Sequence, residues 1–348
     1  MRPSRIFQTL ARTGALLLAA SVNTVSMAAQ PLTLTGAGAT FPAPLYQRWF
    51  RDYFREHPQV RVDYQGIGSG AGIENFLGGR LDFAGSDLPM TEADTAKVEG
   101  GIVQIPLSAG AVILAYDLPG IEGLRLSRDA VSGIFLGQIQ RWNDPRIRAA
   151  NKGVDLPDMP VTLVARSDSS GTSFVVTRHL SAVSEQFAHT VGSTMTPVWP
   201  KALKKQGALI RAKGNGGIAA TVKAVPGSIG YVQYAYADLT DMQMASLENK
   251  AGEYVAPNSE SFRAAVESFK ADLDPRDLAD PYGGGSYPIL TLSWLITRKT
   301  LEPEKAQALK DVVRYCLGDG RKTASLLGYI PLTEQAVKQI LLRLGSIK

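Results

Sequence analysis

The sequence predicts an α/β protein built as two lobes, with a mainly parallel sheet covered by helices. Strand-like apolar segments alternate with helical patterns along the chain, which is typical of this class. Three of these strands lead through loops rich in Gly, Ser and Thr directly into helices. Two turn-rich stretches, Tyr116–Gly120 and Asp280–Pro288, adjoin apolar segments and are candidate crossings between the lobes.

Two crossings would place both ends of the chain in one lobe and its middle in the other. The predicted division is a lobe I formed by residues 29–115 and 290–348, and a lobe II formed by residues 116–289. The 348 residues allow two lobes of roughly 100–200 residues, each with its own core. Paired crossings between α/β lobes are suited to hinge closure around a ligand in the cleft.

Residues 1–28 have the pattern of a signal peptide. Three arginines precede the apolar run Gly14–Ala20, which is too short to span a bilayer, and small residues precede a cleavage point after Ala28. We therefore expect export to the periplasm as a soluble mature chain. The 37 basic and 32 acidic residues give a net charge of +5, and losing the three leader arginines lowers it to about +2. This balance does not favour a nucleic-acid partner.

The elements follow from apolar periodicity and from Pro and Gly at their ends. Pro42 opens the first long helix, in which a stripe from Leu45 to Phe54 is expected to face the core. The expected strands are Leu32–Thr35, Val60–Tyr64, Leu81–Ala84, Val103–Pro106, Ala111–Tyr116, Val161–Ala165, Ile229–Val232 and Ile289–Ile296. The expected helices are Pro42–His57, Gly72–Leu77, Arg128–Leu136, Ser173–Leu180, Ile218–Ala224, Ser259–Phe269, Pro303–Tyr315 and Thr333–Leu344.

The first of the three loops carries Thr40 between the strand after Leu32 and the helix after Pro42. The free N–H groups and positive end of such a helix make a site for an anion. The alternative is that Thr40 only caps the helix, which is the usual role of Thr at this position.

The second loop, Gly66–Gly72, has several interpretations. It can be a flexible turn, or a dinucleotide loop with Asp87 at the matching distance, although the helix that follows is short and ends at Gly78. A P-loop is excluded because no Gly-Lys-Ser/Thr follows. In the anion-site interpretation, the hydroxyl of Ser69 and the neighbouring N–H groups bind the ligand.

Asp87 follows the strand that ends near Ala84. It can cap the next helix, as Asp often does. As part of an anion site, its carboxylate would instead accept a hydrogen bond from a proton on the ligand.

The third loop, which runs from Arg166 to Thr172, is the strongest single motif. The guanidinium of Arg166 presents a planar donor fork that suits a tetrahedral oxyanion, and Asp168 is close enough to pair with it. Ser170 and Thr172 add hydroxyls, while Gly171 lets the backbone approach closely. The alternative is a surface loop with a local ion pair worth at most about 1 kcal/mol.

The sequence offers no good candidate for catalysis, a cofactor or a metal. His57, His179 and His189 have no metal-ligand spacing, and a relay from Ser170 to His179 lacks the G-x-S-x-G elbow. Cys316 is the only cysteine and lies on an apolar helix pattern, where a thiol acts as a small hydrophobe. We expect a binding protein rather than an enzyme.

A series of motifs, in order along most of the mature chain, carries a family resemblance. The motifs are Leu34–Pro44, Tyr64–Ser69, Asp82-Phe83, Ser86-Asp87, Ser170–Phe174, Lys213–Asn215, Gly217–Ala220, Pro226–Val232 and Tyr234–Tyr236. Together they closely resemble the periplasmic phosphate-binding proteins of bacterial phosphate ABC importers. The stretch from about Leu301 resembles this family less clearly.

The resemblance implies a two-lobed venus-flytrap fold with inorganic phosphate in the cleft. Position by position, it implies a phosphate site of Thr40, Phe41, Ser69, Asp87, Arg166, Ser170, Gly171 and Thr172, with Asp168 orienting Arg166. In this site Asp87 accepts the ligand proton. One departure is Gly70, where the family often has a second Ser.

The expected function is therefore the delivery of periplasmic phosphate to an inner-membrane ABC permease by a monomer without catalysis. A receptor for another tetrahedral oxyanion, such as sulfate or molybdate, is the alternative within binding proteins. A secreted phosphatase and an adhesion or signalling module are the alternatives from other classes.

Overall fold

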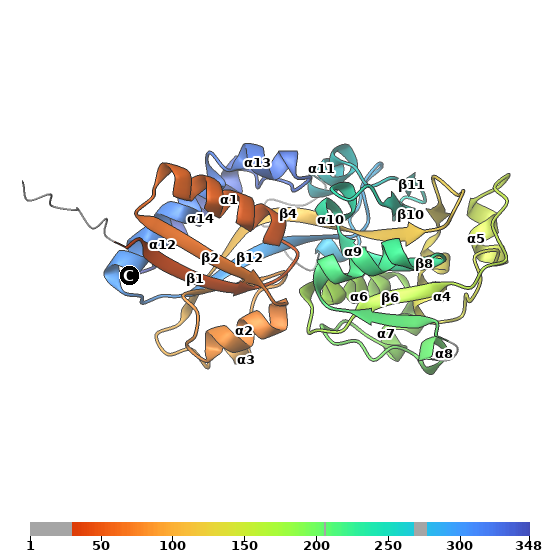
Figure 1. Cartoon of the computed structure of the whole chain (residues 1–348), viewed down its shortest axis with the longest axis horizontal. Coiled ribbons are helices and arrows are strands. Elements are labelled where there is room, and N and C mark those ends of the chain that lie inside the picture. The colour runs from red at the N-terminus through yellow and green to blue at the C-terminus, as the bar shows by residue number, and fades with distance from the viewer. Residues whose placement is uncertain (1–29, 205–206, 268–276) are drawn as a thin grey trace, which may run out of the picture. The chain divides into compact units, whose positions relative to one another are not determined.

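Two lobes share one sheet that runs through the chain (Figure 1). The computed structural model describes residues 30–204, 207–267 and 277–348, so the predicted leader lies outside the described residues. The elements below belong to a single compact unit, Pro31–Lys348. The two-lobed α/β architecture predicted from the sequence is confirmed.

The strands of lobe I lie in the order β2-β1-β3-β12-β4. The first three strands are parallel, whereas β12 is antiparallel to both of its neighbours. Their bounds are β1 Leu32–Gly38, β2 Val60–Gly66, β3 Phe83–Ser86, β4 Ile102–Asp117 and β12 Leu290–Arg298.

The sheet continues into lobe II in the order β4-β8-β6-β7. Here β6 is parallel to both neighbours, and β8 is antiparallel to β4. The bounds are β6 Thr162–Arg166, β7 Leu209–Ala212 and β8 Ser228–Gln233, with β9 Gln243–Met244 also on β4. A small separate sheet consists of β5 Arg125–Leu126, β10 Ser246–Glu248 and β11 Tyr254–Val255.

One strand, β4, joins the two halves of the sheet, as Figure 1 shows. Its partner changes from β12 at Ala111 to β8 at Val112. The sequence predicted two strands here, Val103–Pro106 and Ala111–Tyr116. Pairing with β12 instead carries one strand through Pro106 and Gly110, with a register irregularity at Ser293/Trp294. The sheet is thus mixed rather than mainly parallel, while the lobe boundaries named above stay predictions.

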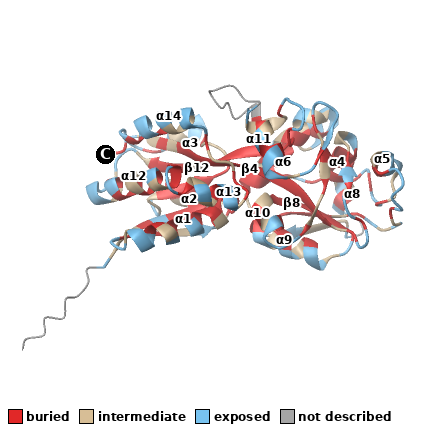
Figure 2. Cartoon of the chain, turned by 90° about the horizontal axis from the view of Figure 1, so that it is seen from above, coloured by how far each residue is buried: buried red, intermediate tan, exposed pale blue. Residues whose placement is uncertain are grey.

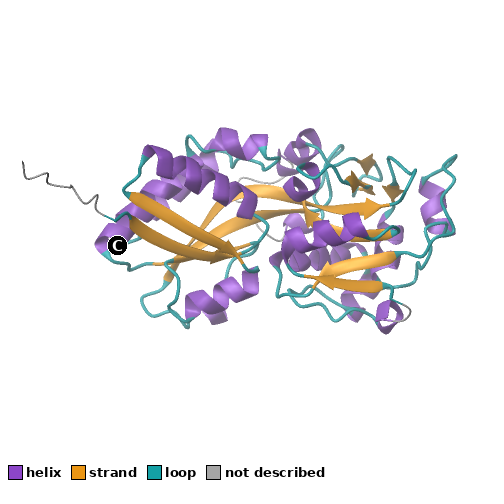
Figure 3. Ribbon diagram, viewed as in Figure 1, coloured by secondary structure: helices purple, strands orange, loops and turns teal. Residues whose placement is uncertain are grey.

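The helices of lobe I cover its strands on both sides (Figure 3). The first helix buries Leu45, Tyr46, Trp49, Phe50 and Tyr53, and the indole N–H of Trp49 donates to the carbonyl of Gly320 at 2.7 Å. The expected core position Phe54 is instead exposed. The bounds are α1 Ala43–Glu56, α2 Ser69–Leu77, α3 Glu92–Thr95, α12 Pro303–Leu317, α13 Arg321–Leu326 and α14 Glu334–Leu344.

In lobe II, α9 lies on one face of the sheet and α6 with α4 on the other (Figures 1 and 2). Several short elements were not predicted, because they have too few turns to produce a periodic pattern. The bounds are α4 Arg128–Phe135, α5 Pro145–Ala150, α6 Gly171–Val183, α7 Glu185–Thr190, α8 Lys201–Lys204, α9 Gly214–Ala224, α10 Tyr234–Asp238, α11 Ser259–Glu267 and a 3-10 turn Asp277–Ala279. The predicted end of the eleventh helix at Phe269 lies outside the described residues.

The buried residues follow the strands through both lobes, as the red ribbons in Figure 2 show. The central strands therefore lie in a dry interior, whereas the edge strands β2 and β7 keep exposed residues, and the carboxyl ends of the parallel strands face the region where the two lobes meet. Loops at those ends bring polar groups into an environment that excludes water. This placement decides the chemistry of the candidate site.

Candidate functional site

Lobe I contributes loops from the carboxyl ends of three neighbouring strands. Thr40 follows β1, Ser69 begins α2 after β2, and Asp87 follows β3. All three are buried. The backbone N–H of Asp87 donates to the hydroxyl of Ser69 at 3.4 Å, so the loops after β2 and β3 are in direct contact.

Neither Thr40 nor Asp87 caps a helix, so the helix-cap interpretation is wrong for both residues. The helix α1 has Pro42 at its N-cap and no side-chain cap, and α3 is capped by Thr91. The hydroxyl oxygen of Thr40 instead accepts hydrogen bonds from Asn215 in lobe II. The ring of Phe41 is buried, and its carbonyl accepts the hydroxyl of Tyr329 at 2.6 Å.

Lobe II contributes the loop between β6 and α6. Arg166 is the last residue of β6, and its Nε donates to Oδ1 of Asp168 at 2.8 Å, while its Nη2 donates to Oδ2. The N–H of Gly214 at the start of α9 also donates to Oδ1 of Asp168, at 3.0 Å. The guanidinium is therefore held in one orientation within a buried pair.

Ser170 is the N-cap residue of α6. Its hydroxyl accepts the N–H of Ser173 at 3.0 Å. This leaves the hydroxyl hydrogen of Ser170 as its remaining donor. Gly171 and Thr172 form the first turn of α6.

The two sets of loops meet in the structure. The hydroxyl of Thr172 donates to Oδ2 of Asp87 at 3.2 Å, and the N–H of Gly70 donates to the carbonyl of Ser169 at 3.2 Å. A Cβ atom on Gly171 would lie 2.5 Å from the hydroxyl oxygen of Ser69, so only glycine permits this approach. All eight predicted binding residues and Asp168 thus lie on the loops that come together where the lobes meet.

Gly70, the departure from the family pattern, has a steric explanation. A Cβ there would lie 2.1 Å from the hydroxyl oxygen of Ser169 and 2.4 Å from its Cβ. A serine at position 70 could not fit beside Ser169 in this arrangement. The glycine contributes its backbone N–H to the contact between the lobes and no side-chain hydroxyl.

Two buried charged atoms at this junction have no hydrogen-bond partner among the described residues. They are Oδ1 of Asp87 and Nη1 of Arg166. Burial raises the pKa of the Asp87 carboxyl to about 7, although the charge of Arg166 and the hydroxyl of Thr172 lower it. Burial also acts to raise the pKa of Asp168, but the hydrogen bond and charge of Arg166 outweigh it, so this pKa is lowered.

Sequence reasoning missed two residues of this region, Asn215 and Tyr236. Asn215 bonds to the hydroxyls of Thr40 and Thr172, and the hydroxyl of Tyr236 donates to the carbonyl of Thr40 at 2.7 Å. Both residues stood in the motifs that carried the family resemblance, without an assigned role. Their contacts join positions far apart in the sequence, and only the fold could reveal these.

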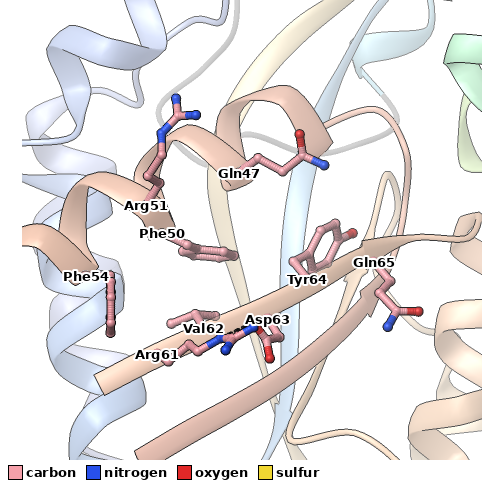
Figure 4. A pocket seen from close by; sticks show the side chains of 9 residues that line it. All are labelled: Gln47, Phe50, Arg51, Phe54, Arg61, Val62, Asp63, Tyr64 and Gln65. Carbon is pink, nitrogen blue, oxygen red and sulfur yellow. Dashed lines mark hydrogen bonds and ion pairs between the residues drawn. The ribbon is translucent and has the colours of Figure 1, made fainter. Parts of the chain in front are cut away.

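A hollow of about 570 Å³ lies apart from this site, between α1 and β2 (Figure 4). Its lining includes Phe50 and Phe54 from α1 and the exposed ion pair between Arg61 and Asp63 from β2. None of its lining side chains has a buried polar atom that lacks a partner in the described part of the chain. Its charged groups are exposed to solvent, so it differs in character from the junction of the lobes.

The groups considered for catalysis are in ordinary structural positions. His179 is buried with Nδ1 2.8 Å from the carbonyl of Ala279, and burial lowers its pKa. Cys316 is buried, and burial raises its pKa. Within residues 30–204, 207–267 and 277–348, no cluster of three His, Cys, Asp or Glu could hold a metal ion, and no helix is long and apolar enough to cross a membrane.

Comparison with known proteins gives the class of the chain. Residues 23–319 match the family described as the PBP superfamily domain, so the protein is a member of that superfamily. It is 38% identical over 332 residues to the phosphate-binding protein PstS of Pasteurella multocida, covering 94% of each chain. It is 36% identical to the protein of the same name from Methanocaldococcus jannaschii, covering 89% of this chain and 85% of that one. The chain belongs to the PstS family of phosphate-binding proteins.

Solved structures agree on the fold. A high-affinity periplasmic phosphate-binding protein bound with phosphate matches with a TM-score of 0.71 and 22% identity, over 88% of this chain and 93% of that chain. The phosphate-binding protein of Stenotrophomonas maltophilia matches with a TM-score of 0.68 and 21% identity, over 89% and 93% of the two chains. At these identities, the likeness concerns the two-lobed architecture.

Proposed function

We propose that this chain binds inorganic phosphate between its lobes in the periplasm and delivers it to the inner-membrane permease of an ABC importer. The names of its relatives support this, and so does one observation on the site. Oδ1 of Asp87 and Nη1 of Arg166 are both buried without a partner among the described residues. A buried polar group left unpaired costs about 1–3 kcal/mol, so a ligand that pairs with both is strongly favoured.

Phosphate has the chemistry to pair with both atoms at once. Its anionic oxygens accept hydrogen bonds from Arg166, and a protonated oxygen donates to Asp87. The remaining oxygens receive hydrogen bonds from the two sets of loops. The proposed binding residues are Thr40, Phe41 and Ser69 from lobe I, and Arg166, Ser170, Gly171 and Thr172 from lobe II, with Asp87 as the acceptor and Asp168 positioning Arg166.

Asp87 is also the basis of the proposed selectivity. At pH 8, above the pKa of about 7 that burial gives the Asp87 carboxyl, this group is mostly ionised. Phosphate still carries one proton at this pH, whereas sulfate carries none and would face the carboxylate with lone pairs only. A site built to pair with a ligand hydroxyl rejects an analogue that lacks it by large factors. This argues against sulfate and for arsenate as a competitor.

The remaining parts of the proposal concern the chain as a whole. The leader is removed after Ala28, and the mature protein works as a periplasmic monomer without cofactor, metal, nucleic acid or catalysis of its own. The two lobes, with the boundaries predicted from the sequence, close around phosphate. Small-angle scattering should then show a smaller radius of gyration with phosphate than without it, and an unchanged radius would indicate a rigid pocket.

Calorimetry on the mature chain tests the binding function. Phosphate and arsenate should bind with similar affinity, and sulfate and molybdate at least tenfold more weakly, because a lost pairing worth 1.4 kcal/mol is about tenfold in affinity. Equal affinity for sulfate would favour a general oxyanion receptor. Release of product from a chromogenic phosphate ester would favour a phosphatase.

A further inference from the structure

The amide of Asn215 lies beside two hydroxyls at the junction of the lobes. Asn215 is the second residue of α9 and is fully buried. Its Nδ2 is 2.8 Å from the hydroxyl oxygen of Thr40 in lobe I and 3.2 Å from that of Thr172 in lobe II. Its own backbone N–H also donates to the Thr40 oxygen, at 3.1 Å.

The orientation of this amide follows from the neighbouring strand. The backbone N–H of Gln233 at the end of β8 lies 2.9 Å from Oδ1 of Asn215. A backbone N–H can only donate, so the oxygen of the amide must face Gln233 and the NH₂ group must face the hydroxyls. The direction of both hydrogen bonds is thereby determined.

These hydrogen bonds determine which donors and acceptors of the Thr40 and Thr172 hydroxyls remain available. A hydroxyl has two lone pairs and one hydrogen. The Thr40 oxygen receives two hydrogen bonds from Asn215, so both lone pairs are used and only its hydrogen remains for a ligand. The Thr172 oxygen receives one hydrogen bond from Asn215, and its hydrogen points to Oδ2 of Asp87.

We propose that Asn215 is a positioning residue that directs the hydroxyl hydrogen of Thr40 toward the bound oxyanion and the hydroxyl hydrogen of Thr172 toward Asp87. The proposal rests on the phosphate-binding function proposed above. Oxyanion oxygens accept hydrogen bonds, and a hydroxyl free to rotate would present a lone pair to them in part of its orientations. With both hydroxyls directed, Asp87 remains the acceptor for a ligand proton.

The first test compares two buried asparagines by calorimetry with inorganic phosphate. Asn151 has the same pattern of bonds, with Oδ1 accepting the N–H of Arg125 at 2.9 Å and Nδ2 donating to the carbonyls of Arg125 and Ile147. We expect Asn215→Ala to weaken phosphate binding about tenfold or more, and Asn151→Ala to change it less than about twofold. Equal affinity of Asn215→Ala and the wild type would overturn the proposal.

The second test separates directed hydroxyls from a simple link between the lobes. Asn215 and Thr172 both lie in lobe II and are joined by a hydrogen bond, so an effect of Asn215 on this hydroxyl should appear as coupling between the two residues. In a cycle of Asn215→Ala, Thr172→Val and the double variant, we expect the double variant to lose several-fold less affinity than the product of the single losses. Independent losses would show that Asn215 acts by another route.

These tests distinguish a failure of the role proposed for Asn215 from a failure of the proposed phosphate-binding function. A wild-type chain that does not bind phosphate contradicts the function itself. A wild-type chain that binds phosphate, with an uncoupled or silent Asn215, contradicts only the role of this residue. If Asn215→Ala does not fold, Asn215→Ser retains a small polar group and is measured in the same two experiments, with the same expected coupling to Thr172.

Discussion

Three Arg-x-Asp sequences occur in this chain, and two of them form a local ion pair with the same geometry in very different surroundings. In Arg61-Val62-Asp63 on β2, Nε donates to Oδ1 at 2.7 Å, and in Arg166-Ser167-Asp168 after β6 the same bond is 2.8 Å. The side chains of the first pair are 58% and 44% exposed, and those of the second are 1% and 12% exposed.

Burial, not the motif, makes the difference between the two pairs. Exposed pairs are screened by water and are worth about 0–1 kcal/mol. Desolvated charges are costly unless every donor and acceptor is paired. Arg166 has a spare Nη1 in that dry environment, and Oδ1 of Asp87 is likewise buried without a partner among the described residues. The two pairs therefore provide a natural control for each other.

The largest effect is expected from removing the arginines. Arg166→Ala should weaken phosphate binding roughly thirtyfold to several thousandfold, because losing a buried charged partner of the ligand costs about 2–5 kcal/mol of binding. It should also abolish the contraction on adding phosphate. Calorimetry and scattering provide the two readouts.

Arg61→Ala is the matched control. Its affinity should stay within about twofold of the wild type, since the exposed pair carries at most about 1 kcal/mol. Equal losses in the two variants would mean that burial does not separate the pairs. If Arg166→Ala fails to fold, Arg166→Lys retains the charge, loses the planar donor fork, and should still bind phosphate more weakly.

The second prediction concerns the carboxylate of Asp87 at the buried site. Asp87→Asn retains the shape, removes the charge and adds N–H donors. We expect the ratio of phosphate to sulfate affinity to narrow about tenfold or more, mainly because sulfate is admitted. Calorimetry with both anions measures this ratio, and an unchanged ratio would leave Asp87 without a role in selectivity.

The third prediction compares substitutions of the two aspartates that pair with these arginines, Asp168 and Asp63. Asp168→Asn should lower the free energy of unfolding by about 1–3 kcal/mol, because Arg166 then lacks its charged partner in a buried place. Asp63→Asn should change it by no more than about 0.5 kcal/mol. Denaturant unfolding without phosphate measures both, and similar small losses would count against a strong buried pair.

The smallest expected effect is the pH dependence that burial gives to Asp87. Its pKa is about 7 in the folded protein, against the usual value near 4 in an unfolded chain. Between these values the folded protein binds a proton that the unfolded chain does not, so this carboxyl lowers the free energy of unfolding as pH rises through that window.

Thermal unfolding in phosphate-free buffer measures this dependence. Relative to the wild type, the melting temperature of Asp87→Asn should rise by about 2–4 °C between pH 5 and pH 8, because the variant does not have the buried charge. A difference between variant and wild type that does not vary with pH would show that Asp87 is solvated in the unliganded protein.

The sequence was informative where local chemistry and topology agree. Thr40, Ser69 and Asp87 each follow one of the parallel strands β1, β2 and β3, and the adjacency of these strands in the sheet brings the three residues together. Gly171 is a further example, because its lack of a side chain permits the approach of Ser69. The roles of these residues in binding phosphate remain predictions.

Local sequence patterns were not enough to predict features that depend on contacts between residues far apart in the sequence. Thr40 could equally well have been a helix cap, and only its bonds to Asn215, which lies 175 positions away, remove that alternative. Two strands were predicted where pairing with β12 carries one strand through Pro106 and Gly110. Asn215 itself gave no signal of a role, because its three partners come from three other elements.

The position of β12 has a consequence for how the chain folds during its synthesis. Strands β6, β7 and β8, which complete lobe II on β4, all come from residues 162–233. Lobe I has its first three strands much earlier, but β3 and β4 are joined only when Leu290–Arg298 arrives between them. Until then, both strands have an unpaired edge, which is prone to aggregation. The lobe whose synthesis begins first is therefore the last to complete its sheet.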